Sequence, residues 1–235
     1  MNSIIIGAGS AIAQAVIQSL HANAENIITV SRKLPDQSNP VIHGFTSDYS
    51  PTSIAKVIQQ IKDLNLGSID RVYICNGVLQ NDNIKVEKRI EDLDSESFMS
   101  VLHSNTLTPI LWVQALLPIL RQQNCTITVF SARIGSISDN NLGGWYSYRA
   151  SKAALNMLLK NACVEYAKRA KGVKILAFHP GTTDTPLSKP FQKNVPKGKL
   201  FSPEFVATSL EEIIQNLEVD GQLSFKDWQS KDILW

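Results

Sequence analysis

Two residues with acid–base side chains, Tyr148 and Lys152, lie four positions apart in the segment GGWYSYRASKAALNMLLK, residues 143–160. After Tyr148 the apolar residues recur at helical spacing, which predicts a helix that begins after a glycine turn. Residues four positions apart lie one turn apart on the same face of a helix. The phenol and the ammonium group are therefore expected to lie close enough to act on one reacting group.

The phenol of tyrosine has a pKa of about 10, which makes it a poor proton carrier at neutral pH. An ammonium group about 4 Å away, at an effective dielectric constant of about 20, stabilises the phenolate by roughly 4 kcal/mol before desolvation is counted. We therefore expect Lys152 to lower the pKa of Tyr148 by about two units. The pair suits proton transfer to or from a carbonyl or alcohol oxygen, although the same spacing also occurs in solvated pairs without a function.

The composition is that of a soluble globular protein, with 43% hydrophobic and 19% charged residues among 235. A net charge of +2, spread along the chain, gives no basic patch for nucleic acid. No apolar run is long enough to span a membrane, and no basic leader precedes the first predicted strand. The three cysteines are far apart, which predicts reduced thiols and a cytoplasmic location. No metal site is predicted.

The first elements of the chain are a strand, a glycine turn and a helix. Residues 3–6 are a short apolar run that ends at Gly7, and Ser10 can cap the following helix. The backbone N–H groups of such a turn and the dipole of the helix favour a bound phosphate. A second strand over residues 26–31 completes a βαβ unit with a right-handed crossover.

The end of this second strand predicts which dinucleotide would bind, because Arg32 and Lys33 follow Ser31. In a dinucleotide-binding βαβ unit, an acid at this place binds a free ribose 2′-hydroxyl, and a cation accommodates a 2′-phosphate. The sequence has no Asp or Glu between Asn26 and Pro35. It therefore favours NADP(H), with NAD(H) possible. The alternative interpretation is that the two cations are a solvated strand end.

Four further strands alternate with helices along the chain. The strands are predicted at residues 41–45, 69–75, 126–130 and 173–178, with intervening helices at 51–64, 95–122 and 146–171. A break is expected in the middle of the second of these helices, where Asn105 is followed by Pro109. A last helix is predicted at 203–217 and a short strand at 221–225. The pattern predicts a single domain over residues 1–235, an α/β fold with a doubly wound, Rossmann-like parallel sheet and helices on both faces.

Polar residues or glycines follow the carboxyl ends of the predicted strands. In doubly wound sheets, ligands bind beyond these ends. The residues at these places are Gly7 to Ser10, Arg32, Asp48, Asn76, Gly77, Ser131, Pro180 and Gly181. Because they come from different strands, we expect them to converge on one ligand.

With these motifs, the chain resembles the short-chain dehydrogenase/reductase family over residues 4–219. Within the family it is most similar to the C-signal-like proteins and the sniffer-type carbonyl reductases, chiefly through SARIGSISDNNLGGWYSYRASKAALNM. The resemblance implies that Tyr148 is the general acid or base and that Lys152 holds the nicotinamide ribose. It places the family's helix asparagine at Asn105, as part of a proton relay.

The resemblance also implies cofactor contacts along the whole edge of the sheet, from the phosphate turn through the adenosine contacts to the proline-glycine turn after the sixth strand. The expected cofactor-binding residues are Gly7, Gly9, Ser10, Ala11, Ile12, Ser31, Arg32, Asp48, Asn76, Gly77, Tyr148, Lys152, Pro180, Gly181, Thr183 and Thr185. The phosphate turn departs from the family pattern, because Ala11 and Ala13 stand at its second and third glycine positions. Gly9 and Ser10 can still offer N–H groups, so we expect binding to survive.

A second departure concerns the family's catalytic serine, whose position is occupied by Ala132. The hydroxyl that binds the substrate oxygen is therefore expected from Ser131, with Ser136 as the alternative. Residues 186–203, with four lysines and four prolines, resemble the family's variable substrate lid. The lysines could attract an acidic substrate or the cofactor phosphates, or form a solvated loop. Trp145 suggests an aromatic wall of the substrate pocket but could equally pack a turn.

These features predict an NADP(H)-dependent oxidoreductase that transfers hydride between nicotinamide and a small carbonyl or alcohol substrate, with reduction as the favoured direction. The family resemblance implies a homodimer or homotetramer, and no nucleic-acid or membrane partner is expected. The alternative is a low-turnover dinucleotide-binding sensor or signalling protein on the same fold. Ala132 favours that alternative, whereas Tyr148, Lys152 and Asn105 favour the enzyme.

Overall fold

A seven-stranded parallel sheet forms the centre of the computed structural model, which describes residues 1–34 and 39–235. The strand order is β3-β2-β1-β4-β5-β6-β9, so the chain moves outward from β1 in one direction and then in the other. This is the predicted doubly wound, Rossmann-like arrangement. The strands are β1 (Asn2–Ile6), β2 (Asn26–Ser31), β3 (Ile42–Thr46), β4 (Arg71–Ile74), β5 (Cys125–Phe130), β6 (Val173–His179) and β9 (Ser224–Asp227).

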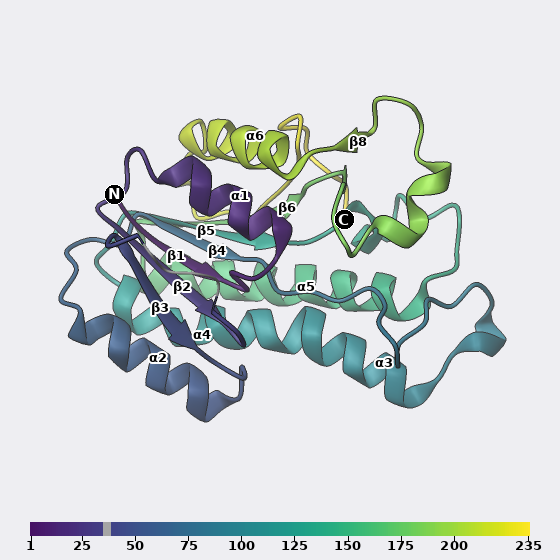
Figure 1. Ribbon diagram of the computed structural model, residues 1–235, viewed down its shortest axis with the longest axis horizontal. Helices are drawn as coiled ribbons and strands as arrows, with labels where there is room; N and C mark the ends of the chain where they lie inside the picture. Colours follow the sequence, from purple (N-terminus) through teal and green to yellow (C-terminus); the bar gives the residue numbers. More distant parts are fainter. Residues whose placement is uncertain (35–38) are drawn as a thin grey trace.

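Helices cover both faces of this sheet (Figure 1). On one face lie α1 (Ala11–Leu20) and α6 (Pro203–Gln215). On the other lie α2 (Pro51–Asp63), α4 (Thr108–Leu120) and α5 (Tyr146–Arg169), with α3 (Ser95–Leu102) leading into α4. Each face has its own buried apolar cluster. Because both faces are covered, the central strands β1 and β5 are buried along their whole length, including their polar residues Asn2, Ser3, Thr126 and Thr128.

The predicted break in the long second helix is a single π-helical turn, His103–Leu107, between α3 and α4. Asn105 and Thr106 are buried within it. Pro109 lies in the first turn of α4, directly after the π-helical turn. A π-helical turn inserted into an α-helix often marks a functional site.

The predicted last strand is shifted towards the carboxyl end of the chain and becomes β9, which pairs in parallel with β6. The Trp235 ring stacks on Phe225 of this strand, with ring centroids 5.2 Å apart. The apolar tail is therefore packed on the core. A short two-stranded sheet joins β7 (Thr182–Thr183) to β8 (Leu200–Phe201) beside the main sheet.

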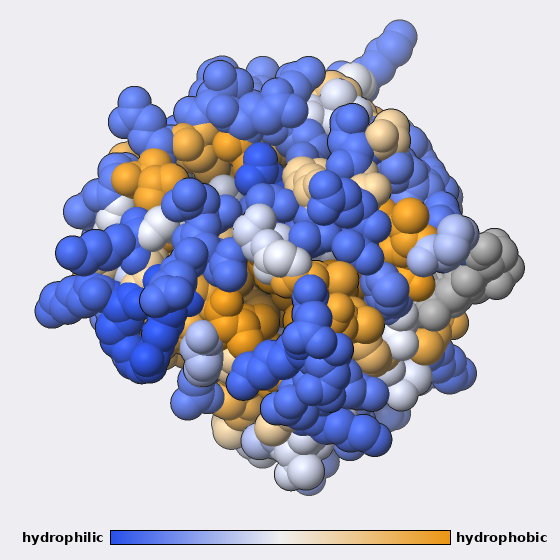
Figure 2. Space-filling model, turned by 90° about the vertical axis from the view of Figure 1, so that its left-hand side faces the viewer, coloured by the Kyte–Doolittle hydropathy of each residue, from blue (hydrophilic) through white to orange (hydrophobic). Residues whose placement is uncertain are grey.

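Pockets lie at the end of the molecule where the strands of the main sheet begin. Figure 2 shows this side, with apolar side chains in a central hollow and hydrophilic ones around it. One pocket there is lined by Ile61, Leu66 and Ile119 among others. A more polar one lies between Glu25 and Arg71. Both lie away from the carboxyl ends of the strands, where ligands of this fold class bind.

No helix within residues 1–34 and 39–235 is both long and apolar enough to cross a membrane.

Candidate active site

Tyr148 and Lys152 lie in the first two turns of α5, as predicted. The Lys152 Nζ atom lies 5.8 Å from the centre of the Tyr148 ring. The same nitrogen donates a hydrogen bond of 2.8 Å to the backbone oxygen of Phe130, at the end of β5. Lys152 is only 3% exposed, and Tyr148 is partly buried. The helix and the end of β5 thus hold both side chains in one largely enclosed place.

The electrostatics of the pair differ from the sequence-based expectation. Burial raises the pKa of Tyr148 to about 12. Burial also lowers the pKa of Lys152 to about 8. The expected lowering of the Tyr148 pKa by Lys152 is therefore wrong for this arrangement. The cause is desolvation, which disfavours the charged form of both groups.

Asn105 connects the π-helical turn to the loop after β4. Its side-chain oxygen accepts a hydrogen bond of 2.7 Å from the Val78 N–H, and its nitrogen donates one of 2.8 Å to the Val78 carbonyl. The same nitrogen also donates to Ser151 Oγ on α5, at 3.1 Å. A Cβ atom on Gly77 would lie 3.6 Å from Asn105 Oδ1 and 3.7 Å from Lys152 Nζ. Gly77 therefore lies where the polar heads of Asn105 and Lys152 meet.

The two candidate serines are both buried and both have partners. Ser131 Oγ donates a hydrogen bond of 2.7 Å to Asn156 Oδ1 on α5. Ser136 Oγ lies 3.3 Å from Ser138 Oγ and accepts a hydrogen bond from the Asp139 N–H. A substrate carbonyl needs a donated proton, and a serine has one to give. In this arrangement the Ser131 hydroxyl already donates its hydrogen bond to Asn156 Oδ1.

The phosphate turn between β1 and α1 has the predicted form. Gly7 has φ +79°, and a Cβ atom there would lie 3.0 Å from the backbone carbon of Cys75, so only glycine fits. Ser10 caps α1 by accepting a hydrogen bond from the Ala13 N–H at 3.2 Å. The N–H groups of Ala11 and Ile12, in the first turn of α1, have no intrahelical acceptor and can bind an anion.

Residues after β2 and β3 flank this turn. A Cβ atom on Gly9 would lie 3.4 Å from Ser31 Oγ, so the turn and the end of β2 are in contact. Ser31 is buried, whereas Arg32 is exposed beside it. Asp48 is exposed, and its carboxylate accepts a hydrogen bond of 2.9 Å from the Ser50 N–H, which holds its pKa below the usual value.

The remaining predicted residues lie after β4 and β6. Asn76 has a buried side-chain oxygen, and Thr183 a buried hydroxyl, that find no hydrogen-bond partner within residues 1–34 and 39–235. Gly181 has φ +73°, and a Cβ atom there would collide with the Phe201 ring at 2.7 Å. Pro180 precedes it as the chain leaves β6. The backbone carbonyl of Thr185 accepts hydrogen bonds from the N–H groups of residues 188 and 189.

The segment 186–203 is more ordered than a bare loop. It contains a 3-10 helix, Lys189–Asn194, and ends with β8. Phe191 of this helix contacts Trp145, with ring centroids 4.8 Å apart, and Trp145 in turn lies 6.3 Å from Tyr148, edge to face. An aromatic chain therefore joins the segment to the catalytic tyrosine candidate. Lys199 lies 5.9 Å from the centre of the Trp228 ring.

Glu87 was not among the predicted site residues, yet it holds the start of α5. Its carboxylate accepts hydrogen bonds from the N–H and the hydroxyl of Ser147, and its backbone carbonyl accepts one of 2.6 Å from the Trp145 N–H. Only 4% of Glu87 is exposed. Nothing in the sequence links Glu87 to a residue 60 positions later. A glutamate in a long polar loop reads as a solvated side chain.

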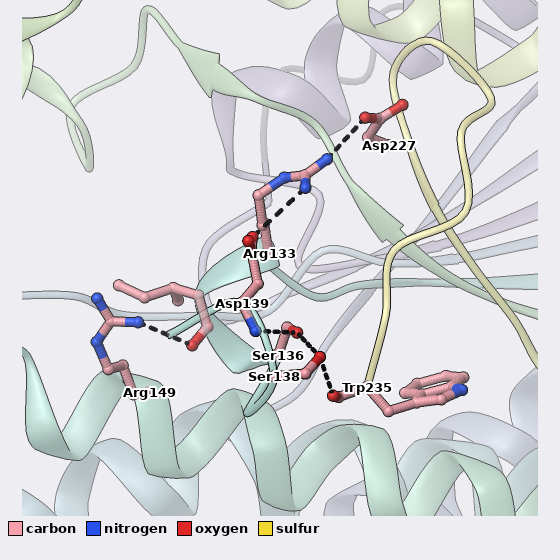
Figure 3. Close-up of polar contacts among 8 residues, drawn as sticks. Arg133, Ser136, Ser138, Asp139, Arg149, Asp227 and Trp235 are labelled. Carbon is pink, nitrogen blue, oxygen red and sulfur yellow. Dashed lines mark hydrogen bonds and ion pairs between the residues drawn. The ribbon is translucent and has the colours of Figure 1, made fainter. Parts of the chain in front are cut away.

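The loop after β5 is fixed by the last strand and the tail, as Figure 3 shows. Arg133 points away from α5 and forms ion pairs with Asp227 at 2.9 Å and with Asp139 at 3.4 Å. The N–H and the hydroxyl of Ser138 both donate to the Trp235 carbonyl, at 3.1 and 2.7 Å. These contacts hold the loop that carries Ser131 and Ser136, although Arg133 and Asp227 were not among the predicted residues.

The residues at this edge of the sheet fit a dinucleotide. A glycine cradle and free helix N–H groups suit its phosphates, and the buried unpaired atoms of Asn76 and Thr183 suit its ribose hydroxyls or amide. These groups come from the ends of three different strands, β1, β4 and β6, as binding at a switch in strand order requires.

Comparison with known proteins agrees with this arrangement. A family model described as short chain dehydrogenase matches residues 2–196. The chain is 29% identical over 231 residues to 1-hydroxy-2-glutathionyl-2-methyl-3-butene dehydrogenase of Rhodococcus sp. (strain AD45), covering 95% of this chain and 96% of the relative. It is 25% identical to benzil reductase ((S)-benzoin forming) of Bacillus cereus, covering 92% and 94%. A shorter match, 30% identical over 61% of this chain and 82% of the relative, is to C-signal of Myxococcus xanthus.

Solved structures share the fold over the full chain. The sniffer carbonyl reductase of D. melanogaster superposes with a TM-score of 0.84 at 19% identity, covering 100% of this chain and 99% of that one. An NADPH-bound carbonyl reductase from chicken fatty liver gives the same TM-score at 22% identity, covering 100% and 98%.

Proposed function

Because the chain belongs to the short-chain dehydrogenase family, we propose that this oxidoreductase is an NADPH-dependent reductase that converts a carbonyl compound to an alcohol. The observation that carries the proposal is the meeting of Tyr148, Lys152 and Asn105 beside Gly77. These side chains come from α5 and the π-helical turn, and they face the end of β4. A purely structural domain would not need the polar groups of Asn105 and Lys152 buried together at the end of β4.

Each residue has a proposed role in the reaction. NADPH, when bound, supplies the hydride that the carbonyl carbon takes up. Tyr148 donates a proton to the carbonyl oxygen, and its raised pKa of about 12 keeps that proton in place at neutral pH. Lys152 holds the nicotinamide ribose, and Asn105 orders the path by which Tyr148 regains a proton. Ser131 binds the substrate oxygen, with Ser136 as the alternative.

The preference for NADPH rests on the end of β2. Arg32 is exposed beside the buried Ser31, and Ser31 contacts the phosphate turn through Gly9. A guanidinium group there can bind a 2′-phosphate by charge-assisted hydrogen bonds. The NADPH bound to the chicken carbonyl reductase supports the same cofactor, and the name of the Bacillus relative supports a carbonyl substrate.

The long helices present apolar side chains that support association into a dimer or tetramer. Met157 and Val164 on α5 are 63% and 49% exposed, and Leu107 before α4 is 44% exposed. Exposed apolar groups gathered on neighbouring helices are typical of contact surfaces between protein chains.

The experiment measures cofactor binding first and turnover second, in the same samples. Fluorescence titrations with NADPH and NADH use the wild type, Arg32→Ala and, as a matched control, Lys33→Ala. We expect Arg32→Ala to weaken NADPH binding by about tenfold or more and to leave NADH binding unchanged. Lys33→Ala is expected to change neither by more than about threefold.

Turnover is then followed as NADPH oxidation with a panel of ketones and aldehydes, with Tyr148→Phe as the inactive control. We expect Tyr148→Phe to lose at least about a hundredfold in kcat, as removal of a general acid does. Tight NADPH binding without turnover across the panel would favour a dinucleotide sensor instead. Failure to bind either nucleotide would mean that Ala11 and Ala13 block the phosphate turn.

A further inference from the structure

Trp145 has an unusual backbone conformation directly before the catalytic helix. It is the N-cap of α5, with φ +53° and ψ +43°, in the left-handed region. A bulky side chain rarely adopts this region, because its Cβ atom approaches the following carbonyl group. Gly143 and Gly144, which precede it, also have positive φ and adopt it freely. Strain of this kind is retained where the side chain has a use, and it is concentrated at functional sites.

The position of the Trp145 ring indicates that use. Its centroid lies 6.3 Å from the Tyr148 ring and 4.8 Å from the Phe191 ring. Both Trp145 and Phe191 are only partly buried, so part of each residue is accessible to a ligand. The strained backbone is held in place because the Trp145 N–H donates to the buried residue Glu87. The indole therefore stands fixed between the proton donor and the 3-10 helix of residues 189–194.

The segments on either side of Tyr148 expose apolar side chains. In the loop after β5, Ile137 is 79% exposed and Leu142 is 92% exposed. In the segment 186–203, Leu187 and Leu200 are each 39% exposed. Scattered exposed apolar residues need no explanation, but four in the two segments that flank one candidate site favour an apolar ligand.

We propose that the Trp145 and Phe191 rings, which pack on each other, form one aromatic surface that selects carbonyl compounds bearing a flat aromatic group next to the carbonyl. We call this surface the clamp. This inference rests on the proposed function and names its substrate class. The aromatic group packs against the two rings while the carbonyl oxygen faces the Tyr148 hydroxyl. Aromatic side chains bind such groups by offset or edge-to-face packing together with burial of apolar area. Trp145 and Phe191 are thus specificity-determining residues.

The test compares Trp145→Gly and Phe191→Ala with the wild type on benzil and on 2,3-butanedione, an aliphatic diketone. We expect kcat/KM for benzil to fall at least about tenfold in both variants, from the loss of aromatic packing. Turnover of 2,3-butanedione is expected to stay within about threefold. Glycine adopts the left-handed region without strain, so Trp145→Gly should keep the melting temperature of the wild type.

Two control variants separate the clamp from general effects. Asn65→Gly replaces another non-glycine residue with positive φ, at the far end of the sheet. Trp235→Ala removes a half-exposed tryptophan ring that stacks on Phe225 instead of facing Tyr148. Both should keep the wild-type ratio of kcat/KM for benzil over 2,3-butanedione. A fall in melting temperature for Trp145→Gly with an unchanged ratio would show that Trp145 only packs the turn, and would overturn the proposal.

Calorimetric titration with benzil, with and without NADP⁺, tests the clamp without turnover. We expect Trp145→Gly and Phe191→Ala to bind benzil about tenfold more weakly than the wild type does. Equal affinity in wild type and variants, or no binding by the wild type, would overturn the clamp. Because this result does not depend on NADPH oxidation, an inactive protein that binds benzil through the two rings would refute the reductase and retain the clamp.

Discussion

The Glu87 carboxylate accepts hydrogen bonds from both the N–H and the hydroxyl of Ser147, the second residue of α5. Tyr148 follows Ser147 directly, so a side chain in the loop after β4 fixes the helical turn that carries the proposed proton donor. The negative charge also lies at the amino end of a helix of 24 residues, where the helix dipole favours it. The same loop is held at Val78 by Asn105.

We predict that Glu87→Ala lowers kcat by about tenfold or more while NADPH affinity changes by less than about threefold. The variant leaves the first turn of α5 without its cap, which costs about 0.5–2 kcal/mol of stability, and Tyr148 loses its fixed position. Glu87→Gln keeps an acceptor oxygen for the Ser147 N–H and should restore most of the turnover. Steady-state kinetics, NADPH titration and urea unfolding measure the three quantities.

The matched control is Asp94→Ala, which removes the side-chain cap of α3. It should lower the free energy of unfolding by a similar amount and leave kcat unchanged. If Glu87→Ala and Asp94→Ala lose stability alike and neither loses turnover, Glu87 is only a cap. Glu87 would then have no part in positioning Tyr148.

The buried ammonium group of Lys152 predicts a pH dependence of stability. Burial lowers its pKa from 10.5 to about 8. Below pH 8 the group is charged in both the folded and the unfolded state, so folding carries the whole desolvation cost of about 3 kcal/mol. Between pH 8 and 10.5 the folded protein releases the proton before the unfolded chain does. The unfolded state then binds more protons, and stability rises with pH until the cost is gone.

The measurement is the free energy of unfolding of wild type and Lys152→Met in urea, from pH 7 to 10.5. We expect the free energy of unfolding of the wild type to rise relative to that of Lys152→Met by up to about 3 kcal/mol over this range, mainly above pH 8. Taking the difference between the two proteins removes the contribution of the other titrating groups. Lys160→Met, which removes an exposed ammonium group from the same helix, is the control. A difference between wild type and Lys152→Met that stays constant with pH would contradict the buried charge.

The fold was predictable because its signals are local. Largely apolar segments such as residues 26–31 and 126–130 predict strands of a sheet that is covered on both faces. They match β2 and β5 almost residue for residue. Asn105 with Pro109 predicted a broken helix, and the break is a π-helical turn. The expected convergence of the strand-end residues rests on the rule that parallel strands end at one edge, and it stays a prediction.

Other features of the site depend on distant partners, and the sequence carries no sign of them. Glu87 meets Ser147 across 60 positions, and Asp227 meets Arg133 across 94. The pKa of Tyr148 was expected to fall, because the helical spacing shows that the Lys152 charge is near. The spacing does not show that Tyr148 is desolvated, and this desolvation raises its pKa. Ser131 fits the expected strand end, yet its direction towards Asn156 depends on how α5 packs on β5.

The hydrogen bond of Ser131 therefore leads to a prediction about the chemistry that one substitution can test. Its proton is directed at Asn156 Oδ1, while the buried Asn156 Nδ2 finds no acceptor within residues 1–34 and 39–235. A rotated Asn156 amide would donate from Nδ2 to Ser131 Oγ and free the Ser131 proton for a substrate oxygen. We expect Ser131→Ala to lower kcat by about a hundredfold or more, as loss of one oxyanion donor does.

Ser136→Ala is the matched control, because Ser136 is also buried but its hydroxyl contacts residues of its own loop. The Ser136 Oγ atom accepts a hydrogen bond from the Asp139 N–H and lies beside Ser138 Oγ. We expect its kcat to stay within about threefold of the wild type. Asn156→Asp presents only acceptor oxygens when ionised and keeps the Ser131 proton away from the substrate, so it should reproduce the loss in kcat without removing Ser131. The reverse ranking of the two serine variants would transfer the role to Ser136. Normal turnover in both would mean that Tyr148 polarises the carbonyl alone, and that the alanine at 132 marks a site that works without a serine.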